Sequence, residues 1–222
     1  RDRMRRFLWY EMDSYLRARG SDSLREEPLA TVDPSQGYVH YRKGSVALYH
    51  LKEMIGEDKI NAALRNLIDQ FAYSGPPYPT SLDLIAALRE QTPEDKQYLL
   101  EDLFERITLF DNRILNAEYL ERGDGKVEVT GEFETKKLVS DEDGTESEIE
   151  MNDAIEIGAF AKPEDGSKYG ATLYRQRLQL TAGKHEHTFV IDEVPHQAGV
   201  DPFALLLDSV GDDNLKRVSE KP

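Results

Sequence analysis

Four residues that could take part in chemistry follow one another in the stretch "GYVHYRKGSVALYH": His40, Tyr41, Arg42 and Lys43. A tyrosine at the start of a helix can direct its hydroxyl into a cleft. A phenol with a pKa of about 10 stays protonated at neutral pH, so it can donate a hydrogen bond to a developing oxyanion. Gly44 follows and indicates close backbone packing, because glycine inside a helix costs roughly 1 kcal/mol relative to alanine. From the residues alone, the simpler interpretation is a half-buried Tyr41 beside a solvated Arg42 and Lys43.

No complete catalytic or metal-binding pattern occurs in the sequence, which lacks H-E-x-x-H, G-x-S-x-G and glycine-rich phosphate loops. His185 and His187 would share one face of a strand, so a common metal is sterically possible, but exposed residues at a sheet edge are the favoured interpretation. The acidic run "SDEDGTESEIE" lacks the spacing of a calcium loop and is expected to be a solvated turn. We therefore expect neither a bound cofactor nor a catalytic metal in this chain.

Composition limits the classes of function. The 222 residues carry a net charge of −15, which argues against binding to nucleic acid or anionic lipid. The absence of cysteine excludes disulfides and a thiolate nucleophile. No apolar run reaches the length of about 18 residues that a membrane span needs, so a soluble domain is expected. The cellular compartment is left open by these observations.

Two periodicities divide the chain near residue 112. Up to that point apolar residues recur every three or four positions, which predicts at least five helices, the last ending near "LFERITLF". Beyond it the period is two, and Gly123, Asp124 and Gly125 predict a hairpin turn. The predicted fold class is α+β: a helical half at residues 1–112 and an antiparallel, Ig-like β-sandwich at residues 113–222. The tail after Pro202 is expected to pack its apolar part on the sandwich and to fray at its polar end.

The segment "YVHYRKGSVALYHLKEMIGEDKINAALRNLI" resembles the Y-x-K-G helix and the following L-x-x-x-x-G-E turn of the aminopeptidase N family of zinc metallopeptidases. The similarity continues through "PTSLDLIAALRE" and "LLEDLFERITLFDNRILNAEY". The segment "DEVPHQAGVDPFALLLDSVGDDN" is similar to the end of bacterial members whose peptidase domain is fused behind an ABC-type permease. The resemblance covers nearly the whole chain and implies that residues 1–112 are the helical half of a thermolysin-like catalytic domain.

In that family the tyrosine of Y-x-K-G donates a hydrogen bond to the oxyanion formed when zinc-bound water attacks the scissile carbonyl. The resemblance implies this role for Tyr41. Tyr38 lies where some members carry a second tyrosine near the substrate, and Lys43 and Gly44 match structural positions. The H-E-x-x-H helix, the distal Glu ligand and the loop that holds the substrate's α-amine lie upstream in the family and are missing from this sequence. We therefore expect the chain alone to bind no catalytic zinc and to be inactive.

Three hypotheses follow, in decreasing order of weight. The chain is the C-terminal part of a zinc-dependent aminopeptidase-like peptidase, which cleaves peptides together with an upstream catalytic subdomain. Alternatively, it is a non-catalytic interaction module that docks to a permease domain or another partner of a membrane-associated parent. Finally, it is an independent binding protein in which Y-x-K-G is a coincidence, and Tyr41 packed inside the core would favour that hypothesis. The first hypothesis also predicts an exposed apolar face, and hence self-association into a homo-oligomer.

Overall fold

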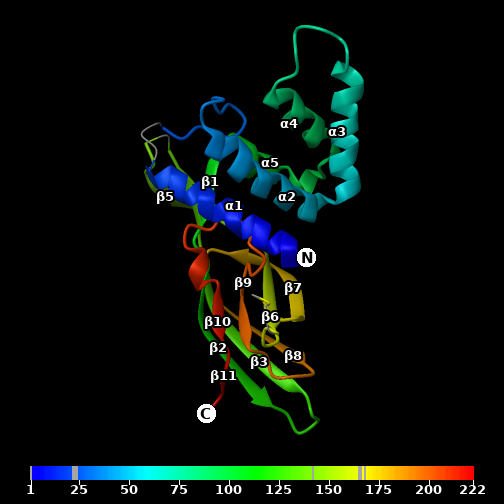
Figure 1. The fold of residues 1–222 in the computed structure, drawn as a ribbon. Coiled ribbons are helices and arrows are strands. Elements are labelled where there is room, and N and C mark those ends of the chain that lie inside the picture. The colour runs from blue at the N-terminus through cyan, green and yellow to red at the C-terminus, as the bar shows by residue number, and fades with distance from the viewer. Residues whose placement is uncertain (1, 22–24, 142, 165–166, 168) are drawn as a thin grey trace.

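The computed structural model describes residues 2–21, 25–141, 143–164, 167 and 169–222, and its helices and sheets occupy different parts of the molecule (Figure 1). This segregation confirms the predicted α+β class. The helical part contains α1 (Asp2–Ser21), the π-helical segment η1 (Tyr38–Lys43), α2 (Gly44–Ile55), α3 (Glu57–Phe71), α4 (Ser81–Gln91), the 3-10 turn η2 (Glu94–Lys96), α5 (Tyr98–Leu100) and a second π-helical segment, η3 (Glu101–Glu105).

The strands of the described residues form three sheets. A small sheet has the order β1-β4-β5, and the two larger sheets have the orders β10-β9-β6-β7 and β11-β2-β3-β8. Their pairings are antiparallel except for that of β11 with β2, which is parallel. The strands are β1 (Ile107–Phe110), β2 (Arg113–Glu121), β3 (Val127–Thr135), β4 (Lys137–Ser140), β5 (Glu146–Ile149), β6 (Asn152–Phe160), β7 (Thr172–Thr181), β8 (Gly183–Ile191), β9 (Gln197–Val200), β10 (Leu215–Arg217) and β11 (Ser219–Glu220).

The two larger sheets enclose one hydrophobic core and so form the predicted sandwich. Alternate residues of β3 are buried, and Val129 and Phe133 meet Ile155 and Ile157 of β6 in the same cluster. The hairpin predicted at residues 123–125 joins β2 to β3. There the Arg122 N–H donates to the Lys126 carbonyl at 2.8 Å. Gly125 adopts a φ of 79°, which a residue with a side chain rarely adopts.

The boundary between the two halves differs from the prediction. The helical part ends with η3 at Glu105, and after Arg106 the residues "ITLF" form β1. A short 3-10 turn, η4 (Gly211–Asp213), lies near the C-terminus. All four residues of β1 are buried, which explains why their pattern cannot distinguish a buried helical turn from a buried strand. Ile107 lies opposite Ser140 of β4. The helical half therefore gives way to a third sheet, which the sequence did not predict.

The C-terminal tail agrees with the prediction only in part. Leu206 lies in the core of the sandwich as expected. Leu205 and Leu207 pack in one cluster with Leu8 and Met12 of α1, so the tail joins α1 to the sandwich. The Phe110 N–H donates to the Leu207 carbonyl at 2.8 Å. The expected fraying of the polar end is wrong, because β10 pairs with β9 and β11 pairs with β2.

Lys137 forms a buried ion cluster where the three parts of the fold meet. Its ammonium group, on β4, lies 2.5 Å from a carboxylate oxygen of Asp102 in η3 and 3.1 Å from one of Asp153 in β6. All three side chains are buried. Burial raises the pKa of Asp102 although the charge of Lys137 opposes that shift. A single cation thus contacts carboxylates from two other elements.

We expect Lys137→Met to destabilise the fold by about 3 to 5 kcal/mol, because it leaves two buried carboxylates without a counter-charge. Urea unfolding measures this change. The triple variant Lys137→Met/Asp102→Asn/Asp153→Asn should recover much of the loss, and Lys126→Met, at an exposed pair with Asp192, should change stability by less than about 0.5 kcal/mol. A loss that persists undiminished in the triple variant would contradict this account.

Asp208 should titrate far above an ordinary aspartate. Burial raises its pKa to about 6, against hydrogen bonds from Val210, Asn112 and Asn214 that lower it. The unfolded chain has a pKa of about 3.9 at this group. Folding therefore favours the protonated form of Asp208. The contribution of this group to the free energy of unfolding is fully present below pH 4 and is lost as the pH rises through about 6. We expect the 13C resonance of the Asp208 carboxyl to show a midpoint near that pH, and an ordinary midpoint would refute the burial argument.

Candidate functional site

The polar side chains of η1 point in different directions. The four residues follow one another within one π-helical segment, and their side chains have different surroundings. Tyr41 is 70% exposed. Arg42 donates to a carboxylate oxygen of Glu11 at 2.9 Å. Lys43 is completely buried, so the expectation that it is solvated is wrong, while its expected structural role is consistent with this burial.

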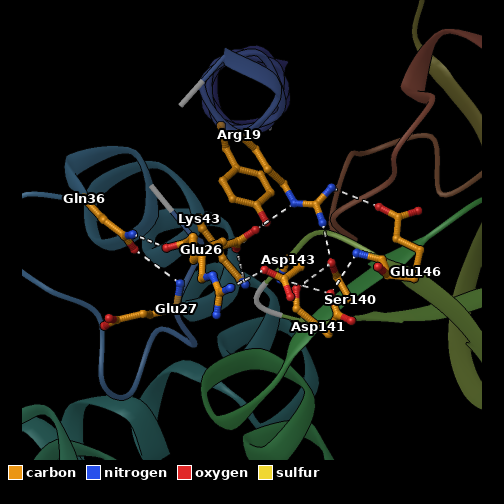
Figure 2. A network of polar contacts seen from close by, with 12 residues as sticks. Arg19, Glu26, Glu27, Gln36, Lys43, Ser140, Asp141, Asp143 and Glu146 are labelled. Atoms are coloured by element: carbon orange, nitrogen blue, oxygen red, sulfur yellow. Dashed lines mark hydrogen bonds and ion pairs between the residues drawn. The ribbon is translucent and has the colours of Figure 1, made fainter. Parts of the chain in front are cut away.

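The Lys43 ammonium group points into the helical part and contacts Glu26 (Figure 2). Glu26 Oε1 lies 3.0 Å from Lys43 Nζ and accepts a hydrogen bond from the Tyr15 hydroxyl at 2.7 Å. Glu26 Oε2 accepts one from Arg19 Nε, also at 2.7 Å. Burial lowers the pKa of Lys43 although Glu26 opposes that shift, and burial together with Glu26 raises the pKa of Tyr15. One carboxylate thus satisfies three donors from two helical segments.

Arg19 extends this network to the small sheet (Figure 2). Its guanidinium group donates to Glu146 of β5 at 2.9 Å and to the Ser140 hydroxyl of β4 at 2.6 Å. The acidic run predicted to be a solvated turn therefore contacts α1 through two of its residues, Ser140 and Glu146. The turn itself is present, since Asp141 Oδ1 accepts hydrogen bonds from the backbone N–H groups of Asp143 and Thr145.

A groove of about 600 Å³ lies beside η1, and Tyr41 and His40 are among the residues that line it. Their rings lie 4.4 Å apart. The groove is bounded by the segment that follows Glu26, by the start of α2, by α4 and by η3. Its lining residues are Leu29, Val32, Pro34, His40, Tyr41, Gly44, Ser45, Leu48, Ser81, Leu84, Ile85 and Phe104. The Glu26 network therefore fixes one wall of the groove relative to the helix that carries Tyr41.

Gly44 lies in the wall of this groove but is not required by close packing. A Cβ atom added there would lie 3.6 Å from Leu29 Cδ1, an ordinary van der Waals distance. Its backbone φ of −58° is helical and open to any residue. The expectation of close backbone approach is wrong for this reason. A larger side chain at this position would instead occupy part of the groove.

The structure separates Tyr38 from Tyr41. The Tyr38 ring stacks on Tyr15 of α1 with the ring centroids 6.1 Å apart, and it packs against the cluster that joins α1 to the C-terminal tail. Residues three apart share a face of an α-helix. In η1 the π-helical turn is wider, so the two tyrosines face different surroundings. Of the two tyrosines, only Tyr41 lines the groove. His40 also lines it, although His40 is not one of the fixed positions of the Y-x-K-G motif.

The histidine pair shares a face of β8, and each imidazole has a hydrogen-bond partner. His185 and His187 lie on the edge strand β8, and both are half-buried instead of exposed. His185 Nε2 lies 2.7 Å from the Thr181 carbonyl, and His187 Nε2 lies 2.8 Å from the Tyr174 hydroxyl. Within the part of the chain that the structure describes, no group of three or more His, Cys, Asp or Glu residues could hold a metal ion.

Comparison with known proteins does not assign a family. No protein-family model matches the chain, and no curated protein matches it significantly. The described helices include none with the length and apolar character needed to cross a membrane.

Two tyrosines offer a matched test of this geometry. Tyr15→Phe removes a donor from the buried Glu26 carboxylate and should cost about 1 to 3 kcal/mol in the free energy of unfolding. Tyr41→Phe removes an exposed hydroxyl and should change that energy by less than about 0.5 kcal/mol. Urea unfolding of both variants measures the difference. Equal losses in the two variants would show that the Tyr41 hydroxyl is bonded inside the fold.

Proposed function

We propose that this chain is the C-terminal part of a zinc-dependent aminopeptidase-like peptidase, and that Tyr41 supplies a hydrogen bond to the oxyanion of the reaction. The observation that carries the proposal is the placement of Tyr41. Its hydroxyl has no hydrogen-bond partner among the described residues, and the exposed side chain lines an apolar groove. The buried contact between Lys43 and Glu26 holds the helix that presents it. In this proposal the helical part belongs to a thermolysin-like catalytic domain.

Peptide hydrolysis places negative charge on the former carbonyl oxygen in the tetrahedral intermediate. A fixed donor directed at that oxygen contributes about 3 to 4 kcal/mol of transition-state stabilisation. Tyr41 can supply this donor without changing its protonation state. The described residues do not fit a zinc ion, so no step through the metal is assigned to this chain. In the resembling family, zinc polarises the carbonyl of the peptide substrate, and here it would be bound by an upstream catalytic subdomain.

A stripe of exposed apolar residues on α1 supports the proposal of such a subdomain. Met4, Phe7 and Tyr10 are exposed and lie three residues apart, so they share one side of the helix. The Arg42 guanidinium carbon lies 5.4 Å from the centre of the Tyr10 ring, which connects this stripe to η1. A subdomain packed on the stripe would come close to Tyr41. Without it, the stripe would favour self-association into a homo-oligomer.

The same stripe supports a second candidate function. In it, the chain is a non-catalytic interaction module of a transporter-type, membrane-associated parent, and the stripe docks a permease domain. The third hypothesis, a coincidental Y-x-K-G, would have been favoured by a core position for Tyr41. Its exposure removes that support.

Activity of the complete protein distinguishes the two candidates. We expect zinc-dependent release of N-terminal residues from peptides, and Tyr41→Phe should lower kcat by about 10² to 10³ with little change in KM, because the hydrogen bond forms in the transition state. Tyr78→Phe, at an exposed tyrosine outside the groove, is the control and should leave kcat unchanged. A complete protein that hydrolyses no peptide would favour the interaction module.

A further inference from the structure

The groove beside Tyr41 offers a ligand apolar contact and almost no hydrogen bonds. Its described lining contains no Asp, Glu, Lys or Arg, although these residues make up 32% of the sequence. The hydroxyls of Ser45 and Ser81 already donate, to the carbonyls of Tyr41 and Ala30. Apart from these serines and from His40 and Tyr41, the lining residues are apolar, and all of them except Phe104 of η3 are non-aromatic.

The polar groups that remain free for a ligand are two neighbouring side chains of the lining. They are the Tyr41 hydroxyl and the His40 imidazole, and no hydrogen bond joins either side chain to another described residue. A ligand that fits therefore has a polar atom beside these two side chains and an uncharged, apolar body in the groove. The volume of about 600 Å³ lies in the range of pockets that enclose a small molecule or a large side chain.

We propose that this groove binds a large, uncharged and apolar side chain of the peptide, next to the carbonyl group whose oxygen Tyr41 contacts. This inference rests on the proposed function, because that function places the peptide carbonyl at the Tyr41 hydroxyl. A charged side chain would lose its hydration in the groove without meeting a partner. The groove therefore selects for apolar side chains and against charged ones.

Binding to the 222-residue chain tests the proposal without any activity measurement. The probes are N-acetyl-L-phenylalaninamide, N-acetyl-L-leucinamide and N-acetyl-L-lysinamide, titrated while the 13C methyl resonances of Leu48, Leu84 and Ile85 are recorded by NMR. We expect saturable shifts with the two apolar probes and at least about tenfold weaker binding of the lysine probe. Equal binding of all three probes, or no shift at these methyl groups, would overturn the proposal.

Variants of the groove sharpen the test. Gly44→Leu adds a side chain beside Leu29 and should weaken binding of the apolar probes by about tenfold or more. Leu29→Ala removes bulk from the same wall and should shift preference toward the phenylalanine probe over the leucine probe. Leu120→Gln, at an exposed position on β2, is the control and should bind as wild type does. Thermal unfolding checks that each variant is folded, and wild-type binding by a folded Gly44→Leu variant would refute the proposal.

Two further measurements separate the possible outcomes. If ultracentrifugation shows a dimer that Gly44→Leu dissociates, and the probes do not bind, a second copy of the chain occupies the groove and the proposal fails.

Tyr41→Phe should retain binding of the apolar probes, because the groove walls provide most of the contact. Probe binding combined with an unchanged kcat for Tyr41→Phe in the complete protein would reject the oxyanion role and leave the groove as an apolar binding site.

Discussion

The arrangement of the candidate site depends on one buried carboxylate, that of Glu26. It neutralises Lys43, accepts a hydrogen bond from Tyr15 and pairs with Arg19, which in turn contacts the small sheet. Removing any one donor would leave buried charge or a buried acceptor incompletely satisfied, which is costly in a medium of low polarity. The chain between residues 25 and 36 is therefore held against α1 and η1, and that chain supplies one wall of the groove.

Two other ion clusters, one buried and one half-buried, join elements that are distant in sequence. Lys137 links η3, β4 and β6, and Arg175 of β7 contacts Glu156 of β6 at 2.6 Å and Glu53 of α2 at 3.5 Å. Buried pairs of this kind add little net stability relative to apolar packing, but their geometry disfavours other arrangements. We infer that these clusters set how the helical part sits on the sandwich. Few basic residues are available in this acidic chain, and several of them serve this purpose inside the fold.

Periodicity alone predicted much of the fold, and its failures have physical causes. The change from a period of three or four to a period of two gave the helical part, the sandwich and the hairpin near Gly125. The same method missed β1, since four consecutive buried residues carry no periodic signal. It also missed the pairing of β10 and β11, which are short strands held by partners far away in sequence. For the site, sequence placed Tyr41 at a helix mouth. It could not indicate the groove, whose walls come from four separated segments.

The spacing within Y-x-K-G explains how one short segment can serve both stability and the proposed chemistry. Tyr41 and Lys43 are two residues apart in the π-helical turn of η1, and one of the two side chains is exposed while the other is buried. Lys43 must face the interior because Glu26 is buried there, and Tyr41 is consequently directed outward. Arg42, between them in the sequence, donates a hydrogen bond to Glu11 of α1. The buried ion pair thus determines the orientation of the phenol, and a substitution at Lys43 would disturb Tyr41 without touching it.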